Sequence, residues 1–391
     1  MSAAETDAAG TAPIDPAALD DLRARIRREV DEGLTPAAQF AVARGGEVLV
    51  AESFGSATDS TRFNVFSCTK ALICGVVWQL IGEGHLASGT RVGELVPRFG
   101  AEGRDAGAMA AITLEQVLTH TGGFPSAPLG PPRWATREGR LDAMSRWRLS
   151  WEPGTRFEYH ATSAHWVAAE MIEVVEGADY RDVVRRRLLE PLGLEDLVLG
   201  VPADEQGDVA ELVPVGEPPS AAALVEMFGT ADLPLGEVTP DVLLAFNDPE
   251  VRAVGVPGGG ALSTAADLAR YYQALLANPG GLWDPAVLAD GTGHVRNRLP
   301  NPMTGEPASR TLGLVVAGDD GKGFLRGMGH RTSPRAFGHN GAAGQIAWAD
   351  PATGVSFVYL TAGVDRDFLR EGRRIVGISS RGGALVPAPG D

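Results

Sequence analysis

The chain has 391 residues, 44% of them hydrophobic, and a formal net charge of −16. This length is enough to bury a sizeable core, in two subdomains or in one large domain with an insertion. The acidic balance argues against nucleic acid and anionic membrane surfaces as partners. No stretch approaches the roughly 18 uninterrupted apolar residues of a membrane span, so we expect a soluble globular protein.

The N-terminal region begins with 16 small, polar and acidic residues. They contain no basic start and no apolar run, so residues 1–16 are predicted to form a disordered leader rather than a signal peptide, and the protein is expected in the cytoplasm. An amphipathic helix is predicted from Asp15 to Gly33. After it, residues 39–44 and 47–54 flank a Gly-Gly turn and predict a β-hairpin.

The next segment carries the first chemical signal. From Ser67 to about Gly84 the chain has no proline and is apolar almost all round, which predicts a buried helix. Residues three apart on a helix share a face, so Ser67 and Lys70 lie about one turn apart, with Ser67 at the N-terminal end. The unpaired amides and the dipole at that end favour an anion.

Lysine is rare in this chain: only two of the 34 basic residues are lysines. Burial can lower the pKa of a lysine until it accepts a proton, whereas an arginine stays charged. We therefore interpret Ser67 and Lys70 as a serine nucleophile and its base. The alternative is a coincidental surface pair, but such a pair does not require a helix that is hydrophobic all round.

Cysteine and histidine are the other potential ligand residues of this part of the chain. Cys68 and Cys74 lie six apart on the predicted helix and point in different directions, so we expect reduced core thiols. His160 and His165 have no Asp, Glu or Cys at ligand spacing. The sequence therefore predicts no metal site and no cofactor.

The middle of the chain differs in character. Residues 85–310 contain recurrent short helical patterns joined by proline-rich connections, which predicts a mostly helical inserted domain. Within it, residues 200–260 are rich in proline and glycine. We expect this segment to form a wall or lid over a cleft.

The C-terminal region mirrors the start of the chain. Residues 345–349 and 355–361 predict a second hairpin, followed by a helix near 365–378. Strands from both termini can join one antiparallel sheet flanked by terminal helices. The sequence thus predicts an α+β fold whose sheet domain combines residues 17–84 and 311–391.

Further motifs accompany Ser67 and Lys70. Tyr159 ends a proline-glycine loop that leads into a predicted helix, His120 lies in a Thr-His-Thr-Gly run, and the triplet from His339 to Gly341 precedes the last hairpin. With these motifs in this order, the chain resembles the serine β-lactamase and penicillin-binding-protein superfamily. It looks most like the class C branch and its carboxylesterase relatives, the family VIII esterases, over nearly its whole length.

The resemblance implies roles for individual residues. Ser67 would be acylated, Lys70 would share its proton with Tyr159, and the amides of Ser67 and Ala342 would form the oxyanion hole. The substrate-binding residues implied or proposed at the last strands are His339, Gly341 and Trp348. Trp348 is predicted to face the cleft and limit acyl size, with a core position as the alternative, and His120 is expected to hydrogen-bond a loop rather than touch substrate.

Two departures from the family pattern bear on the substrate. His339, largely neutral at pH 7, stands where class C enzymes have the lysine of Lys-Thr-Gly, and Ala161 stands where they have an asparagine that contacts the lactam side chain. Both changes favour a neutral small-molecule ester, so the sequence predicts a serine carboxylesterase. A β-lactamase, a D-amino-acid peptidase or amidase, an acyltransferase and a non-catalytic binding protein remain alternatives. No oligomeric state is predicted.

Overall fold

The computed structural model describes residues 13–228 and 238–386. Residues 1–12 of the predicted leader and part of the predicted wall lie outside the described residues. Pro16, the last residue of the predicted leader, is instead the first residue of a helix. No helix within the described ranges is long and apolar enough to cross a membrane.

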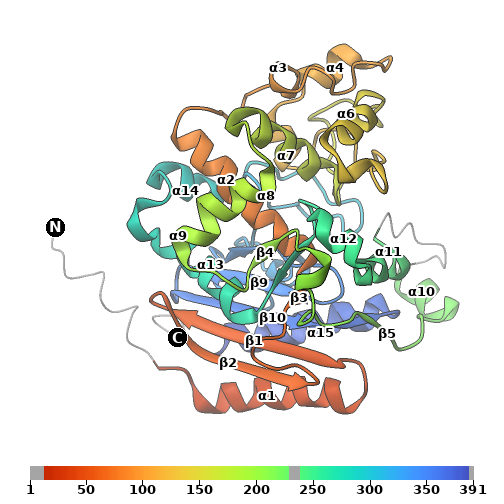
Figure 1. The fold of residues 1–391 in the computed structure, drawn as a ribbon. Coiled ribbons are helices and arrows are strands. Elements are labelled where there is room, and N and C mark those ends of the chain that lie inside the picture. The colour runs from red at the N-terminus through yellow and green to blue at the C-terminus, as the bar shows by residue number, and fades with distance from the viewer. Residues whose placement is uncertain (1–12, 229–237, 387–391) are drawn as a thin grey trace.

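A six-stranded antiparallel sheet joins the two ends of the chain (Figure 1). Strand β1 pairs with β10 in a register that sets Phe40 opposite Tyr359. This pairing confirms that strands from both termini share one sheet, as predicted. In spatial order the strands are β2 (Glu47–Gly55), β1 (Ala37–Arg44), β10 (Val355–Thr361), β9 (Ile346–Asp350), β8 (Phe337–Gly338) and β7 (Val315–Val316).

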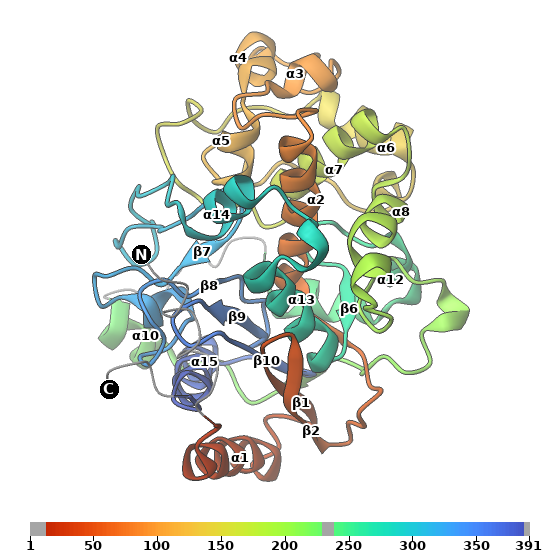
Figure 2. The same ribbon diagram turned by 90° about the vertical axis from the view of Figure 1, so that its left-hand side faces the viewer.

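Helices cover both faces of this sheet (Figure 2). The alternation of side chains along the strands separates two cores. On β1, Phe40 and Val42 point to a core shared with α1 (Pro16–Asp31) and α15 (Phe368–Gly383). Ala41 and Ala43 point to the opposite core, where α13 (Ala265–Ala277) packs against the sheet. The central strands are apolar on both faces because neither face meets water.

The terminal helices begin at side-chain caps. Asp15 accepts a hydrogen bond from the amide of Ala17, and proline follows it at the first helical position, as expected for this start signal. Asp367 accepts from the amides of Leu369 and Arg370, so α15 begins at Phe368 rather than near residue 365. The preceding residues instead form β11 (Gly363–Asp365), which pairs with β5 (Val213–Val215).

The helical part of the molecule lies above the sheet in Figure 1. Helix α13 falls within the range 85–310 predicted as a helical insertion, yet it packs on β1 and β10, so the sheet layer also draws a helix from the middle of the chain. The helical part also contains α2 (Lys70–Gly82), which precedes this range. Within the range it contains α3 (Val92–Leu95), α4 (Ala106–Ala111), α5 (Leu114–Leu118), α6 (Arg137–Ser145), α7 (Ser163–Glu176), α8 (Tyr180–Val184), α9 (Glu190–Leu192) and α14 (Pro285–Gly293).

The proline- and glycine-rich segment 200–260 contains short helices and lies beside the start of α2. Phe246 meets Phe66 edge to face, with ring centroids 5.3 Å apart. A small three-stranded sheet precedes and follows this segment in the chain. Its strands, in spatial order, are β3 (Phe63–Asn64), β6 (Ala261–Ser263) and β4 (Val198–Leu199). The described helices of the segment are α10 (Ala221–Phe228), α11 (Pro240–Leu244) and α12 (Pro249–Val254).

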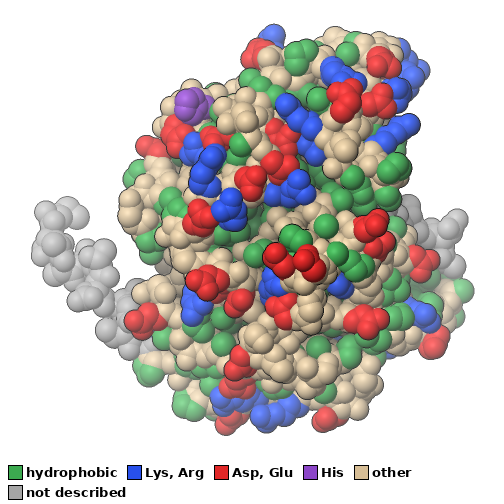
Figure 3. Space-filling model, in the orientation of Figure 1, with side chains coloured by type: hydrophobic (Ala, Val, Ile, Leu, Met, Phe, Trp, Pro, Cys, Tyr) green, Lys and Arg blue, Asp and Glu red, His purple; other side chains and the backbone are tan. Residues whose placement is uncertain are grey.

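The surface carries both signs of charge. On the face shown in Figure 3, acidic and basic side chains are interspersed over the helical region. Charged side chains of the helical region form ion pairs, such as those of Arg187 with Glu83 and Glu176. No broad basic patch appears on that face.

Candidate active site

A sharp turn presents Ser67 at the start of α2. Ser67 lies in a 3₁₀ turn, Phe66–Thr69, and Phe66 before it has a φ of 44°, a left-handed conformation that costs of order 1–3 kcal/mol. Neighbouring backbone holds this turn, because the amide of Val65 donates to the carbonyl of Ala261, and the amide of Ala261 donates to Thr69 Oγ1. Such strain is typical of functional turns.

Lys70 is fully buried, and all three of its ammonium hydrogens have acceptors. Its Nζ donates to Ser67 Oγ at 3.1 Å, to the Ala161 carbonyl at 2.7 Å and to the Gly258 carbonyl at 2.6 Å. Burial lowers the pKa of Lys70, while an ionised Tyr159 would raise it. The acceptors stabilise the protonated lysine and burial stabilises the neutral one, so Lys70 can both take up and return a proton.

Tyr159 completes a cluster around the same serine oxygen. Its hydroxyl hydrogen-bonds Ser67 Oγ at 2.8 Å, and Lys70 Nζ lies 5.0 Å from the ring centroid. The structure thus brings together the three side chains predicted to be catalytic. The hydroxyl of Tyr159 and the amine of Lys70 both lie within hydrogen-bond reach of Ser67 Oγ, which is the arrangement that nucleophile activation requires.

The loop that carries Tyr159 is held by histidines. His120 Nδ1 accepts from the amide of His160 at 3.1 Å, and the amide of Glu158 donates to the His120 carbonyl. His160 Nε2 in turn accepts from the amide of Phe124. These contacts confirm the expectation that His120 bonds a loop, and they fix the backbone on both sides of Tyr159.

His339 is buried beside Tyr159, with ring centroids 5.9 Å apart. Burial lowers the pKa of His339 well below its ordinary value, and the positive charges of Arg310 and Lys70 lower it further. Its imidazole is therefore neutral at pH 7. The ring is fixed by Asn340 and Arg310, whose carbonyl and Nη1 lie 2.8 Å and 3.3 Å from its two nitrogens.

Gly341 allows the last strands to approach the nucleophile turn. A Cβ added at Gly341 would lie 2.3 Å from the carbonyl oxygen of Val65, so only glycine fits there. Ala342, the next residue, is half-buried. Its amide as an oxyanion donor stays a prediction.

Trp348 does not line the cleft, so the prediction that it limits acyl size is wrong. Its indole nitrogen donates to Ser379 Oγ on α15 at 3.0 Å, and its ring lies 5.4 Å from that of Phe357. Trp348 belongs to the core under α1 and α15, while its strand neighbours Ala347 and Ala349 face the opposite core. The alternative of a core tryptophan is the one the structure has.

Arg310 is a residue of this centre that sequence reasoning missed. Its guanidinium carbon lies 5.1 Å from the centroid of the Tyr159 ring and 5.5 Å from that of Phe157, and Nη1 contacts His339 Nε2. Arg310 belongs to no motif and precedes β7 in an irregular segment. Its proximity to Tyr159 depends on the path of that segment, which carries no local signal.

The two cysteines are free and buried. Burial raises the pKa of each thiol to about 12. Cys74 lies beside His165, with Sγ 3.8 Å from Nε2, and Cys68 lies next to the nucleophile in the sequence. Both remain protonated at neutral pH, so neither competes with Ser67 as a nucleophile.

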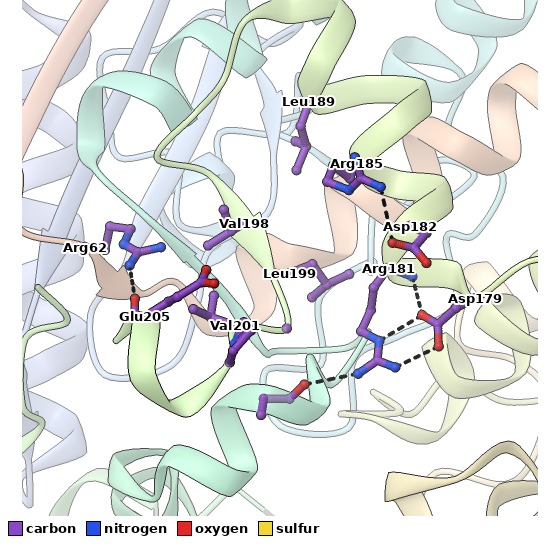
Figure 4. Close-up of a pocket in the computed structure, with 13 residues that line it drawn as sticks. Arg62, Asp179, Arg181, Asp182, Arg185, Leu189, Val198, Leu199, Val201 and Glu205 are labelled. Atoms are coloured by element: carbon purple, nitrogen blue, oxygen red, sulfur yellow. Dashed lines mark hydrogen bonds and ion pairs between the residues drawn. The ribbon is translucent and has the colours of Figure 1, made fainter. Parts of the chain in front are cut away.

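A separate pocket of about 580 Å³ lies between α8 and β4 (Figure 4). Its arginines already have acidic partners, as in the pairing of Arg181 with Asp179. Neither Ser67 nor Lys70 lines it. The pocket is thus distinct from the catalytic cluster.

An α+β fold with a Ser-x-x-Lys turn and a tyrosine on the same serine oxygen has the arrangement of an acyl-transfer enzyme. The chain belongs to the β-lactamase family: the family model described as Beta-lactamase matches residues 22–378. This match confirms the resemblance seen in the sequence.

Individual relatives agree with this assignment. The esterase/beta-lactamase LipL of Mycobacterium tuberculosis is 31% identical over 310 residues, which cover 75% of this chain and 67% of LipL. Esterase EstB of Burkholderia gladioli is 27% identical, covering 90% of this chain and 94% of EstB. A crystal structure of a family VIII carboxylesterase superposes with a TM-score of 0.73 at 24% identity, covering 95% of this chain and 99% of that one, which shows the shared fold.

Proposed function

We propose that this protein is a serine carboxylesterase that hydrolyses small neutral esters through an acyl-enzyme on Ser67. One observation carries the proposal: Ser67 Oγ lies 2.8 Å from the Tyr159 hydroxyl and 3.1 Å from Lys70 Nζ. A serine within hydrogen-bond reach of two proton-accepting groups is an activated nucleophile.

Acylation begins when Ser67 Oγ attacks the ester carbonyl carbon. Tyr159 accepts the serine proton after its own proton has moved to Lys70, whose buried amine is able to take it. The tetrahedral intermediate then collapses, the bond to the alcohol oxygen breaks, and Tyr159 returns a proton to the departing alcohol. Water attacks the acyl-enzyme in the same way and releases the acid and the free serine.

The negative oxygen of the intermediate needs two amide donors. We assign them to Ser67, at the start of α2, and to Ala342. The close contact of Gly341 with the Val65 carbonyl supports this assignment, because it sets the Ala342 segment against the turn that carries Ser67.

The substrate preference follows from two neighbours of the cluster. His339 is neutral, and the side chain at Ala161 is a methyl group, while the Ala161 carbonyl is already engaged by Lys70. The neutral His339 cannot form an ion pair with a substrate carboxylate. The methyl group of Ala161 cannot hydrogen-bond the side chain of a lactam. Both features favour an uncharged ester, and the names of two relatives include the word esterase.

A cytoplasmic location is part of the proposal. Its support is that Cys68 and Cys74 are both free, as expected in a reducing compartment.

β-Lactam hydrolysis is the second candidate, because LipL at 31% identity is named both esterase and beta-lactamase. The test is hydrolysis of p-nitrophenyl butyrate and of nitrocefin by the wild type and by Ser67→Ala. The proposal expects ester turnover that the substitution abolishes, with little or no nitrocefin turnover. A mutant as active as the wild type, or a wild type that prefers nitrocefin, contradicts it. Added alcohol that diverts the acyl group from free acid would identify an acyltransferase.

A further inference from the structure

A buried cation without an acidic partner lies beside Tyr159. Arg310 is 8% exposed, and its Nε atom is buried with no hydrogen-bond partner among the described residues. Among the described residues, its side-chain hydrogen bond is the one between Nη1 and the neutral imidazole of His339, at 3.3 Å. A buried positive charge normally requires an anion close by.

The groups around Arg310 and Tyr159 supply no carboxylate. Helix α2 contributes Lys70 and the protonated thiol of Cys74. The other titratable groups are four histidines: His120 after α5, His160 before α7, His165 in α7 and His339 after β8. Burial lowers the pKa of each of these histidines below its ordinary value, so all four are neutral at pH 7. Within the described residues, the resting centre thus contains the permanent positive charge of Arg310 and no fixed anion.

The guanidinium is placed to act on the proton-accepting pair. It lies over the face of the Tyr159 ring, 5.1 Å from its centroid, and Lys70 Nζ lies 5.0 Å from the same centroid. The charge of Arg310 disfavours a second positive charge on Lys70 and lowers the pKa of that amine. The negative charge on Tyr159 forms when its own proton moves to Lys70, before it takes the serine proton, and this charge lies next to Arg310, where it is stabilised.

Resting on the proposed esterase function, we propose that Arg310 is a positioning residue of the catalytic centre: it orients the Tyr159 ring, and its positive charge keeps Lys70 and Tyr159 ready to accept the proton of Ser67 near neutral pH.

The test is the pH dependence of kcat/KM for Arg310→Met, which removes the charge, and Arg310→Lys, which keeps it. The acidic limb of the Arg310→Met profile should move to higher pH by about one unit, with a loss of about tenfold at pH 7. Arg310→Lys should keep the wild-type limb. Arg252→Met is the matched control, because the Arg252 side chain is also buried and, among the described residues, hydrogen-bonds to Phe246, Gln206 and Asn247. The acidic limb of this variant should not move.

Two esters separate this role from substrate binding. Both p-nitrophenyl butyrate, which is neutral, and p-nitrophenyl hemisuccinate, which carries a carboxylate, should lose activity alike in Arg310→Met. A loss confined to the hemisuccinate would make Arg310 a carboxylate anchor and overturn the proposal, as would an unshifted limb. If Arg310→Met does not fold, Arg310→Gln takes its place.

Reaction of Ser67 with a fluorophosphonate gives a readout that does not depend on ester turnover. The same shift of the acidic limb should appear in the rate of labelling. A wild-type protein that is labelled but hydrolyses neither ester contradicts the esterase function alone. A limb that stays in place in Arg310→Met contradicts the role of Arg310 alone.

Discussion

Gly341 lies so close to Val65 that a methyl group at its Cα would stand 2.3 Å from the Val65 carbonyl oxygen. Two segments nearly 280 residues apart in the chain thus meet without a side chain between them. One carries the nucleophile turn and the other leads to the last hairpin. In the proposed mechanism, their contact sets where a substrate carbonyl lies.

Gly341→Ala should therefore displace one segment from the other. We expect kcat/KM to fall by on the order of 100-fold, because a shift of about 1 Å at a catalytic centre has that effect. Gly372→Ala is the control: Gly372 lies in α15 with open space around its Cα, and this change should leave activity unchanged and raise stability slightly. Ester kinetics and thermal unfolding of both variants check the prediction. Full activity in Gly341→Ala would show that the contact does not position the site.

Lys70→Arg should inactivate the enzyme although it keeps the charge. A guanidinium does not release its proton at neutral pH and is too wide for the space between the carbonyls of Ala161 and Gly258. We expect kcat to fall by at least about 100-fold. Lys322→Arg, at the half-exposed lysine paired with Glu306, should leave kcat unchanged. Steady-state kinetics compare the two, and an active Lys70→Arg would exclude Lys70 as the proton acceptor.

Tyr159→Phe removes one oxygen atom from the cluster. The ring stays packed between its neighbours, so we expect folding to be retained and kcat to fall by about 10²–10⁴-fold. Tyr359→Phe is the matched change in the core on the other side of the sheet and should have no effect on kcat. Comparable activity of Tyr159→Phe and the wild type would leave Lys70 as the sole base.

Trp348→Ala should change stability and leave specificity as it is. Loss of a buried tryptophan typically lowers the free energy of unfolding by about 3–5 kcal/mol. Because the indole packs against α15, the relative rates with acetate, butyrate and octanoate p-nitrophenyl esters should stay as in the wild type. Denaturant unfolding and this ester series test the two halves of the prediction. A shift toward longer acyl chains would place Trp348 in the cleft after all.

Much of the fold follows from local signals. The apolar run after Ser67, the Gly-Gly turn of the first hairpin and the cap at Asp15 each specify an element without reference to the rest of the chain. The pairing of β1 with β10 was predictable because the two terminal hairpins each leave an edge strand with unpaired backbone groups, and the two edges can pair with each other.

The errors have a common physical cause. Both faces of the central strands are buried, so residues 346–349 are apolar at every position and the pattern does not tell which side Trp348 takes. Arg310 reaches Tyr159 only through the course of an irregular segment. Neither outcome is encoded in a short window of sequence, because each depends on which elements pack together.

The acyl-enzyme on Ser67 is the central claim, and peptide mass spectrometry tests it most directly. The protein is mixed briefly with p-nitrophenyl butyrate, quenched in acid and digested. A butyryl group on the peptide that contains Ser67, absent from Ser67→Ala, is the result this account predicts. Ester turnover with the butyryl group on another residue, or with a Ser67 that neither carries a butyryl group nor is labelled by the fluorophosphonate, would contradict it.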